Sequence, residues 1–270
     1  MSLTKEWADA IGSYVEYMQA GGAKRGSMDT RRQHLYRIAR GLGGSPWAVE
    51  TTDLVRWFAA QSWATETRRG YRNSLKSFYK WALLAGHAAS DPVEALPAVK
   101  AAKPHPRPVT DEAYRHALAR ADERVRLMVR LAGELGLRRA EVATVHSRNM
   151  VEDLEGWSLI VTGKGDKTRV LPLPSGLASE LRALPKGWAF PGEDGGHLSP
   201  RWVGTLVGRV LPDGWTMHKL RHRFATKAYE VDRDVFTVQD LLGHASPATT
   251  RVYVAMPRDS LRRTVEAVGR

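Results

Sequence analysis

The sequence contains no cysteine among its 270 residues. This absence excludes disulfide bonds, thiol nucleophiles and zinc sites built from cysteine. No apolar run approaches the length of a membrane span, and Lys5, Glu6 and Asp9 interrupt the region where a secretory signal would need a continuous apolar stretch. The protein is therefore expected to be soluble and not exported, which is compatible with a reducing cytoplasm.

Acidic residues are also scarce, because 29 Asp and Glu stand against 41 Lys and Arg, for a net charge of +12. The excess is divided about equally on the two sides of Pro106. A strongly basic chain favours a polyanionic partner, although excess arginine also serves solubility. Hydrophobic content of 43% and charged content of 26% are close to globular averages, so the chain is expected to fold.

The length suits two domains, and a proline-rich stretch marks the boundary. Residues 96–109 read LPAVKAAKPHPRPV, which holds four prolines and little apolar bulk. Proline removes backbone donors and disfavours helix in the residue before it, so this stretch should be extended. We predict a first domain at 1–96, a linker at 97–108 and a second domain at 109–270.

The first domain is predicted to contain about four helices, because apolar residues recur at spacings of three and four. The helices are expected near residues 7–18, at 30–40, after Thr51 and Thr52, and at 65–84. The last helix has an apolar face and a basic face without an acidic member. Such a face is often simply solvated, but the lack of acidic partners favours phosphate contact. The basic face consists of Arg69, Arg72, Lys76 and Lys80.

The second domain is predicted to be mostly helical with a small antiparallel sheet. Helical patterns cover 111–121 and 124–134, and a further helix opens at Ser199 and Pro200. Between them, Trp157, Leu159 and Val161 alternate, a turn occupies 163–166, and a short strand covers 169–173. The pattern predicts an α+β domain.

Five short segments of this domain carry polar residues of chemical interest. Each is weak alone, since Gly-Leu-Arg is commonly a helix end and Gly-Lys-Gly a hairpin turn. His218 and His222 lie four apart on a helix, but Lys219 occupies the position where a metalloprotease helix has glutamate, and Arg221 repels a cation. The segments are GLRRAE at 136–141, GKG at 163–165, HKLRH at 218–222, LLGH at 241–244, and Tyr253.

In this order, from Gly136 to Tyr253, the segments resemble the tyrosine recombinase or phage integrase family. The family pattern is an arginine in Gly-Leu-Arg-x-x-Glu, a lysine in a β-turn, His-x-x-Arg, then Leu-Gly-His and a tyrosine some nine residues later. Residues 67–81 resemble the family's helical core-binding domain more loosely. The chain resembles a short two-domain integrase that begins with this domain and lacks an arm-binding domain.

The resemblance implies a nucleophilic Tyr253 that forms a 3′-phosphotyrosyl bond with DNA. Two bidentate guanidinium groups are a natural clamp for the charge that develops on the phosphate. A cluster of positive charge also helps to ionise a tyrosine, whose ordinary pKa is near 10. The scheme needs no metal, nucleotide or other cofactor, and no Gly-x-x-x-x-Gly-Lys-Ser/Thr loop occurs. The implied roles are a phosphate clamp for Arg138 and Arg221, a general acid for Lys164, phosphate donation for His244, and proton acceptance or phosphate donation for His218.

The resemblance also implies the partners. They are double-stranded DNA and three further copies of the chain, with a homotetramer on synapsed sites and a monomer or dimer off DNA. A directionality factor is possible, a membrane is not expected, and the setting would be the cytoplasm of a bacterial host. The expected use is integration or excision of a phage or mobile element. The alternatives are a chromosome- or plasmid-resolving recombinase, a related single-strand topoisomerase, and a DNA-binding regulator without catalysis.

Three residues beside these motif positions, and the segment after Tyr253, have predictions of their own. Glu141 is predicted to be structural, either holding Arg138 or packing its helix. Arg139 could exchange roles with Arg138, although the family spacing favours Arg138. His222 is predicted to pack or hydrogen-bond behind the site. After Tyr253 an apolar stripe is expected on a short helix, which docks either on a neighbouring protomer or on its own domain. The stripe consists of Leu261, Val265 and Val268.

Overall fold

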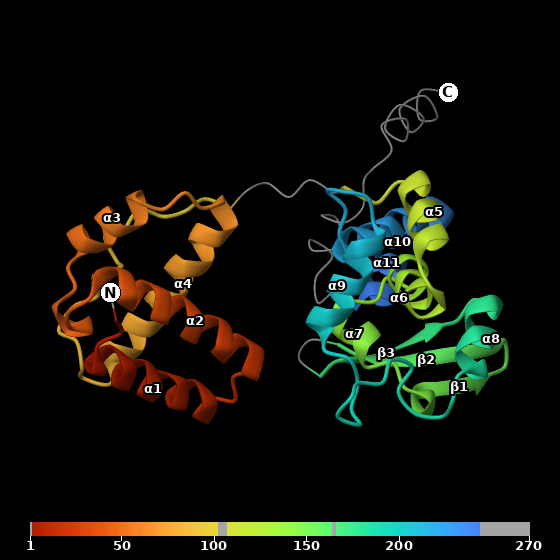
Figure 1. The fold of residues 1–270 in the computed structure, drawn as a ribbon, viewed down its shortest axis with the longest axis horizontal. Helices are drawn as coiled ribbons and strands as arrows, with labels where there is room; N and C mark the ends of the chain where they lie inside the picture. The colour runs from red at the N-terminus through yellow and green to blue at the C-terminus, as the bar shows by residue number, and fades with distance from the viewer. Residues whose placement is uncertain (1, 102–106, 164–165, 244–270) are drawn as a thin grey trace. The chain divides into compact units, whose positions relative to one another are not determined.

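A computed structural model describes residues 2–101, 107–163 and 166–243 of the chain (Figure 1). The chain divides into two compact units, residues 1–103 and residues 104–270, here called the N-terminal and the C-terminal unit. Leu96 and Val109, at the two ends of the proline-rich stretch, are buried in the cores of the N-terminal and C-terminal units respectively. Each unit is therefore described by itself.

The N-terminal unit is helical, as predicted. The α4 boundaries agree with the prediction, whereas α2 begins earlier than expected. The first turn of α2, residues 25–29, carries no buried side chain, so it lacks the apolar periodicity that would have revealed it. The elements are α1 (Lys5–Ala20), α2 (Arg25–Leu42), the short 3₁₀ helix η1 (Pro46–Ala48), α3 (Thr51–Ala59) and α4 (Thr65–Leu84).

The core of the N-terminal unit is rich in aromatic rings. Phe78 of α4 lies 5.7 Å from Trp7 and 5.5 Å from Tyr14, measured between ring centroids. Aromatic pairs at such separations add to the free energy gained by burial. The predicted apolar face of α4 is confirmed, because all of its members are buried: Tyr71, Leu75, Phe78 and Ala82.

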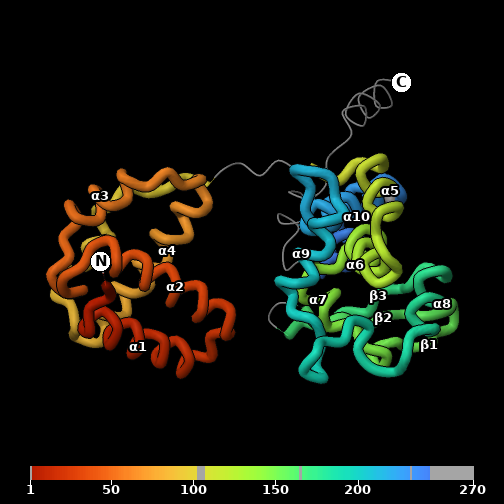
Figure 2. The backbone as a smooth tube through the Cα atoms, viewed as in Figure 1, coloured from red at the N-terminus to blue at the C-terminus, as the bar shows by residue number. Residues whose placement is uncertain are grey.

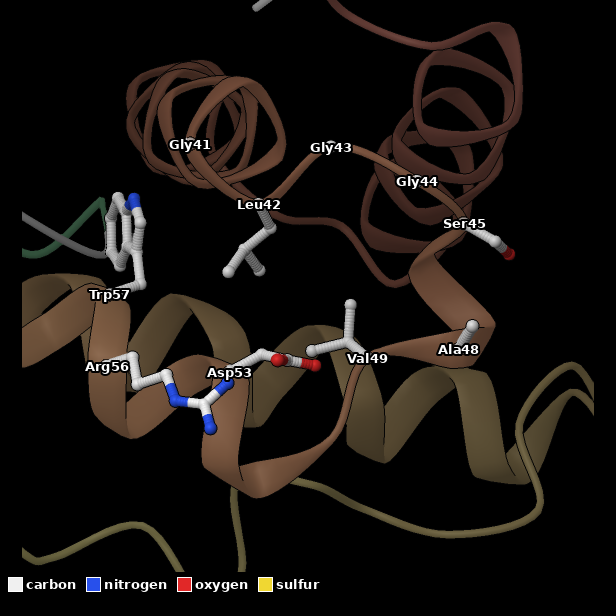
Figure 3. A pocket seen from close by; sticks show the side chains of 10 residues that line it. All are labelled: Gly41, Leu42, Gly43, Gly44, Ser45, Ala48, Val49, Asp53, Arg56 and Trp57. Carbon is white, nitrogen blue, oxygen red and sulfur yellow. The ribbon is translucent and has the colours of Figure 1, made fainter.

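A surface pocket of about 490 Å³ lies where α2 ends and α3 begins (Figure 3). The glycine-rich segment 41–44 lines it, and the indole of Trp57 packs against Gly41. Asp53 also lines it, but its carboxylate accepts a hydrogen bond from the Glu50 N–H and caps α3. The Asp53 carboxylate therefore serves to cap the N-terminus of α3.

The C-terminal unit combines helices with one small sheet, which confirms the predicted α+β class (Figure 1). The three described strands are antiparallel in the order β1-β2-β3, and Val161 pairs with Arg169 across β2 and β3. The elements are α5 (Asp111–Arg120), α6 (Glu123–Glu134), α7 (Arg139–Ala143), η2 (Ser147–Asn149), β1 (Met150–Asp153), β2 (Gly156–Thr162), β3 (Thr168–Pro172), α8 (Ser175–Ala183), α9 (Pro200–Val210), α10 (Met217–Asp232) and α11 (Val235–Leu242).

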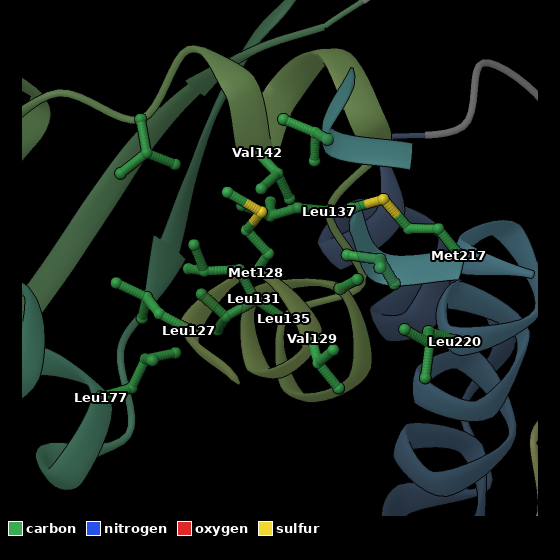
Figure 4. Packing of buried hydrophobic residues seen from close by; sticks show 14 of the residues in the cluster. Leu127, Met128, Val129, Leu131, Leu135, Leu137, Val142, Leu177, Met217 and Leu220 are labelled. Atoms are coloured by element: carbon green, nitrogen blue, oxygen red, sulfur yellow. The ribbon is translucent and has the colours of Figure 1, made fainter. Parts of the chain in front are cut away.

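Helix α6 forms the centre of the C-terminal core (Figure 4). Leu127 lies toward Leu177 of α8, and Met128 lies toward Val142 of α7. Burying each such side chain stabilises the fold by about 1.5–3 kcal/mol. A short turn leads from α6 to α7, which packs against α9, while α10 packs along α6 (Figure 2). The residues at the start of α7 and of α10 are therefore held by a rigid core.

Within the described residues, no helix has both the length and the apolar character needed to cross a membrane.

Candidate active site

Arg138 is placed by a tight turn between α6 and α7. Gly136 has φ +66°, and a Cβ at this position would lie 2.4 Å from Cδ1 of Phe224, so only glycine fits. Leu137 is then buried, and Arg138 occupies the N-cap of α7 with its side chain half-buried. The Gly-Leu-Arg sequence thus places an arginine at the start of a helix.

Glu141 holds Arg138 in two ways, as the sequence predicted. Its Oε2 accepts a hydrogen bond of 2.9 Å from the Arg138 backbone N–H, and its Oε1 accepts one of 2.6 Å from Nη1 of Arg138. Glu141 is only 4% exposed. A carboxylate buried to this extent requires cationic partners.

Two further arginines surround the same carboxylate. Arg169 of β3 donates from Nη1 to Oε1 at 3.1 Å and from Nη2 to Oε2 at 2.9 Å. Arg221 of α10 is 1% exposed and places Nη1 3.8 Å from Oε2, while its guanidinium donates to the carbonyls of Gly136 and Leu242 at 2.5 and 2.6 Å. Three guanidinium groups therefore meet on one carboxylate.

The charge state of this cluster follows from its contacts. Burial alone would raise the pKa of Glu141, but the hydrogen bonds from Arg169 and from the Arg138 backbone, the positive charge of Arg169 and the hydrogen bond from the Arg138 side chain lower it to about 2. The carboxylate is therefore ionised near neutral pH, and arginine stays protonated there. The cluster keeps an excess of positive charge.

His218 lies in the first turn of α10, one turn before Arg221. Burial lowers its pKa, and the positive charges of Arg221, Arg138 and Arg139 lower it further. The ring of His222 is centred 4.8 Å away, and burial followed by the charge of His218 lowers its pKa to about 4. A neutral imidazole at neutral pH can accept a proton.

A pocket of about 620 Å³ opens between α7, α9 and the start of α10. Arg138, Arg221 and His218 all line it. The side chain of Arg139 lies against α9, where a Cβ at Gly204 would be 2.7 Å from its Cδ. No carboxylate is among the lining residues within the described part of the chain, so the pocket suits an anion: they are Leu137, Arg138, Arg139, Ala140, Pro200, Gly204, Gly208, Trp215, Thr216, Met217, His218 and Arg221.

Lys164, His244 and Tyr253, with the predicted apolar stripe of the tail, lie outside the described residues. Gly163 precedes Lys164 in the sequence, and Gly243 precedes His244. Both glycines are described, and both lie beside Arg138. A Cβ at Gly163 would lie 3.5 Å from Nη1 of Arg138, and the Gly243 carbonyl is 3.5 Å from its Nη2. Segments far apart in the sequence thus converge on one arginine.

His218 and His222 do not form a metal site in the described part of the chain, where no three or more of His, Cys, Asp and Glu side chains are grouped to hold an ion.

The basic face of α4 is less uniform than predicted. Arg69 forms an ion pair with Glu66 at 2.8 Å, so the expectation that no acidic side chain accompanies this face is wrong at its first position. Arg72 donates to the Leu96 carbonyl at 2.9 Å. Lys76 and Lys80 are exposed. The two lysines are therefore the members whose charge the fold leaves most accessible.

Sequence reasoning missed Arg169, although a signal for it exists. Arg169, Leu171 and Leu173 alternate, and both leucines are buried. An arginine in phase with buried leucines on a strand faces the core, where it requires an anionic partner. Glu141 is that partner.

The comparisons with known proteins identify the family of the chain. Residues 109–258 match the model of the phage integrase family. Tyrosine recombinase XerC of Bradyrhizobium diazoefficiens is 32% identical over 79% of this chain and 75% of its own length. Tyrosine recombinase XerD of Caulobacter vibrioides is 32% identical over 75% of this chain and 74% of its own length. The chain therefore belongs to the phage integrase family and is a site-specific DNA recombinase of the tyrosine type.

Solved structures share the fold. A lambda integrase tetramer bound to a Holliday junction matches with a TM-score of 0.76 and 20% identity, over 92% of this chain and 76% of that chain. The XerH recombinase bound to a difH substrate matches with a TM-score of 0.66 and 19% identity, over 88% and 78% of the two chains. At such identities the likeness concerns the fold alone.

Proposed function

We propose that this recombinase cuts a DNA strand by attack of Tyr253 on a phosphodiester, which gives a 3′-phosphotyrosyl bond and a free 5′-hydroxyl. The observation that carries the proposal is the meeting of Arg138 and Arg221 on one buried carboxylate, with both arginines and His218 lining one pocket. A pocket with fixed guanidinium groups suits the phosphate of the reacting strand.

Each predicted residue then has a chemical task. Arg138 and Arg221 stabilise the charge that develops on the non-bridging oxygens. His218, with its lowered pKa, accepts the tyrosine proton. Lys164 gives a proton to the leaving 5′ oxygen, and His244 donates a hydrogen bond to the phosphate. The phosphotyrosyl bond conserves the energy of the broken bond, so rejoining needs only a 5′-hydroxyl and no metal or nucleotide.

The DNA partner is double-stranded, and the basic face of α4 is assigned to it. Arg69, Arg72, Lys76 and Lys80 would contact phosphates, which fix position without reading sequence. The lambda integrase and XerH structures are described as bound to DNA, the former as a tetramer. We extend this to a homotetramer of the present chain on synapsed sites, with a monomer or dimer off DNA and a possible directionality factor, in the bacterial cytoplasm.

The biological use that we propose is integration or excision of a phage or mobile element. The description of the matching family as phage integrases supports it. Resolution of chromosomes or plasmids is the alternative, and recombination between two sites on one molecule but not between two molecules would favour it. Relaxation of plasmids that lack any recognition site would favour a topoisomerase instead.

The test uses the full chain and a nicked duplex that the wild-type protein has selected from a randomised pool. Wild type should form a protein–DNA adduct that survives denaturation, and Tyr253→Phe should bind the duplex but form none, because only the nucleophilic oxygen is lost. Tyr229→Phe in α10 is the matched control and should form the adduct. An adduct formed by Tyr253→Phe, or a peptide linked to a 5′ phosphate, would contradict the proposal.

A further inference from the structure

Arg169 joins three segments of the C-terminal unit that are distant in the sequence. Its side chain extends from β3 and is 10% exposed. Nη1 and Nη2 bond both oxygens of Glu141 in α7, and Nε donates to the Leu241 carbonyl in α11 at 2.9 Å. One planar group thus bonds α7 and the last turn of α11 at once.

The geometry requires a guanidinium group. Two parallel N–H donors meet the two oxygens of one carboxylate, and a third donor on the same plane points to a carbonyl. A lysine has one nitrogen on a flexible stem and cannot occupy these three positions together. Charge alone therefore does not replace Arg169.

Through Glu141, Arg169 acts on the phosphate clamp. The carboxylate that it fixes also bonds the backbone and the side chain of Arg138, and it lies 3.8 Å from Arg221. If Arg169 were removed, Glu141 could rotate and carry the Arg138 guanidinium with it. A displacement of about 1 Å at a reacting centre can slow a reaction about 100-fold.

Arg169 also fixes the last turn of α11. Gly243 has φ +63° and ends this helix, and a Cβ there would lie 3.1 Å from Cδ and from Nη1 of Arg169. The Leu242 carbonyl of the same turn accepts from Arg221. The next residue in sequence is His244. The end of α11 thus accepts hydrogen bonds from Arg169 and Arg221, in addition to the longer contact with Arg138.

We propose that Arg169 is a positioning residue for strand cleavage, which sets the relative placement of Arg138, Arg221 and the end of α11. The inference rests on the proposed function, because it concerns the rate of that cleavage. Arg169 touches neither DNA nor the reacting atoms in this scheme, and it acts only through Glu141 and the α11 backbone.

A purely structural role predicts a different result, and Arg130 provides the comparison. It lies in the same unit, is 23% exposed and pairs with Glu134 and Glu180, but it does not line the pocket. Its loss should lower the unfolding temperature without affecting chemistry on bound DNA. Loss of Arg169 should affect both.

The experiment measures single-turnover adduct formation on the selected nicked duplex over a range of protein concentrations. Arg169→Met and Arg169→Lys should each lower the saturated rate about 100-fold and leave the half-saturating concentration unchanged. Arg130→Met should cleave at the wild-type rate. Thermal unfolding shows whether each variant folds. If Arg169→Met does not fold, Arg169→Lys, which keeps the positive charge, tests the positioning role.

A double variant sharpens the test. Since Arg169 acts partly through Glu141, the rate loss of Arg169→Lys combined with Glu141→Gln should be smaller than the product of the two single losses, which is the non-additivity expected for one connected network. A folded Arg169→Lys with the wild-type rate, or a loss confined to the half-saturating concentration, would overturn the positioning role. Failure of wild type itself to form an adduct would instead overturn the proposed function.

Discussion

Two arginine–glutamate clusters in the C-terminal unit have opposite charge balance. In the first, Arg130 of α6 pairs with two carboxylates, Glu134 and Glu180, and Glu134 also accepts a hydrogen bond from Tyr114. In the second, Glu141 alone is surrounded by three arginines: Arg138, Arg169 and Arg221.

The difference separates a cluster that serves the fold from one that is prepared for a ligand. The α6 cluster balances its cation with more than enough negative charge and has no need of an added anion. The Glu141 cluster buries a surplus of positive charge, which is unfavourable unless an anion arrives. Groups held in place before the anion binds need no reorganisation when charge develops on it.

The largest expected effect tests this contrast directly. Arg138→Ala and Arg221→Ala should each lower the saturated rate of adduct formation about 10³-fold, because each removes a donor aimed at the developing charge. Arg130→Ala removes the arginine of the α6 cluster, which lies outside the pocket, and should leave that rate unchanged. The measurement is single-turnover cleavage beside equilibrium binding of the same duplex.

The affinity of each variant for the duplex decides how a loss of rate is interpreted. Interactions made mainly in the transition state affect the rate far more than affinity. Equal losses of rate and of affinity would show that Arg138 and Arg221 are ordinary phosphate contacts.

The sequence predicts the fold where buried residues recur at a regular spacing or where a helix has a capping residue. Helix α4 was predictable to its ends because its buried residues keep a strict helical spacing. Strand β1 was not, since it is four residues long and its side chains are at most half-buried. Helix α8 begins after Pro174 without a side-chain cap, so its start lacks the usual signal.

The site was predictable where short motifs fix geometry. The motifs single out Arg138, His218 and Arg221, and the structure brings these three side chains to one pocket. Arg169 was not, because its partners Glu141 and Leu241 lie 28 and 72 residues away along the chain. Contacts between distant segments require the tertiary structure, and no local pattern states which carboxylate an inward-facing arginine will meet.

A smaller effect concerns acid stability, because protonation places a charge on the partly buried His222. The pKa of His222 is lowered by burial, and then by the charge of His218, to about 4 from its usual 6.5. The unfolded chain therefore takes up a proton before the folded one. This part of the stability is present above pH 6.5 and is lost as the pH falls toward 4.

His222→Asn should remove that dependence, worth about 1–2 kcal/mol after allowance for solvent screening. The measurement is urea unfolding between pH 7 and pH 4, with His116→Asn on the exposed side of α5 as the control. The contribution of Glu141, whose pKa is lowered to about 2, is present above its usual pKa and is lost only at more acidic pH. A His222→Asn variant with the wild-type slope between pH 6.5 and 4 would contradict the assignment.

The smallest effect concerns the N-terminal unit, where the contrast between engaged and available charge recurs on α4. Arg69 is paired with Glu66 and Arg72 donates to the Leu96 carbonyl, whereas no ion pair of Lys76 or Lys80 is found among the described residues. Lys76→Gln and Lys80→Gln should each reduce the slope of log affinity against log salt concentration by about 0.9, the value for one lost phosphate contact on duplex DNA. Arg69→Gln should reduce the slope less, because the charge of Arg69 is already partly neutralised by Glu66.

Binding of the selected duplex at several salt concentrations measures these slopes. Unchanged slopes for both lysine variants would mean that this face of α4 is simply solvated.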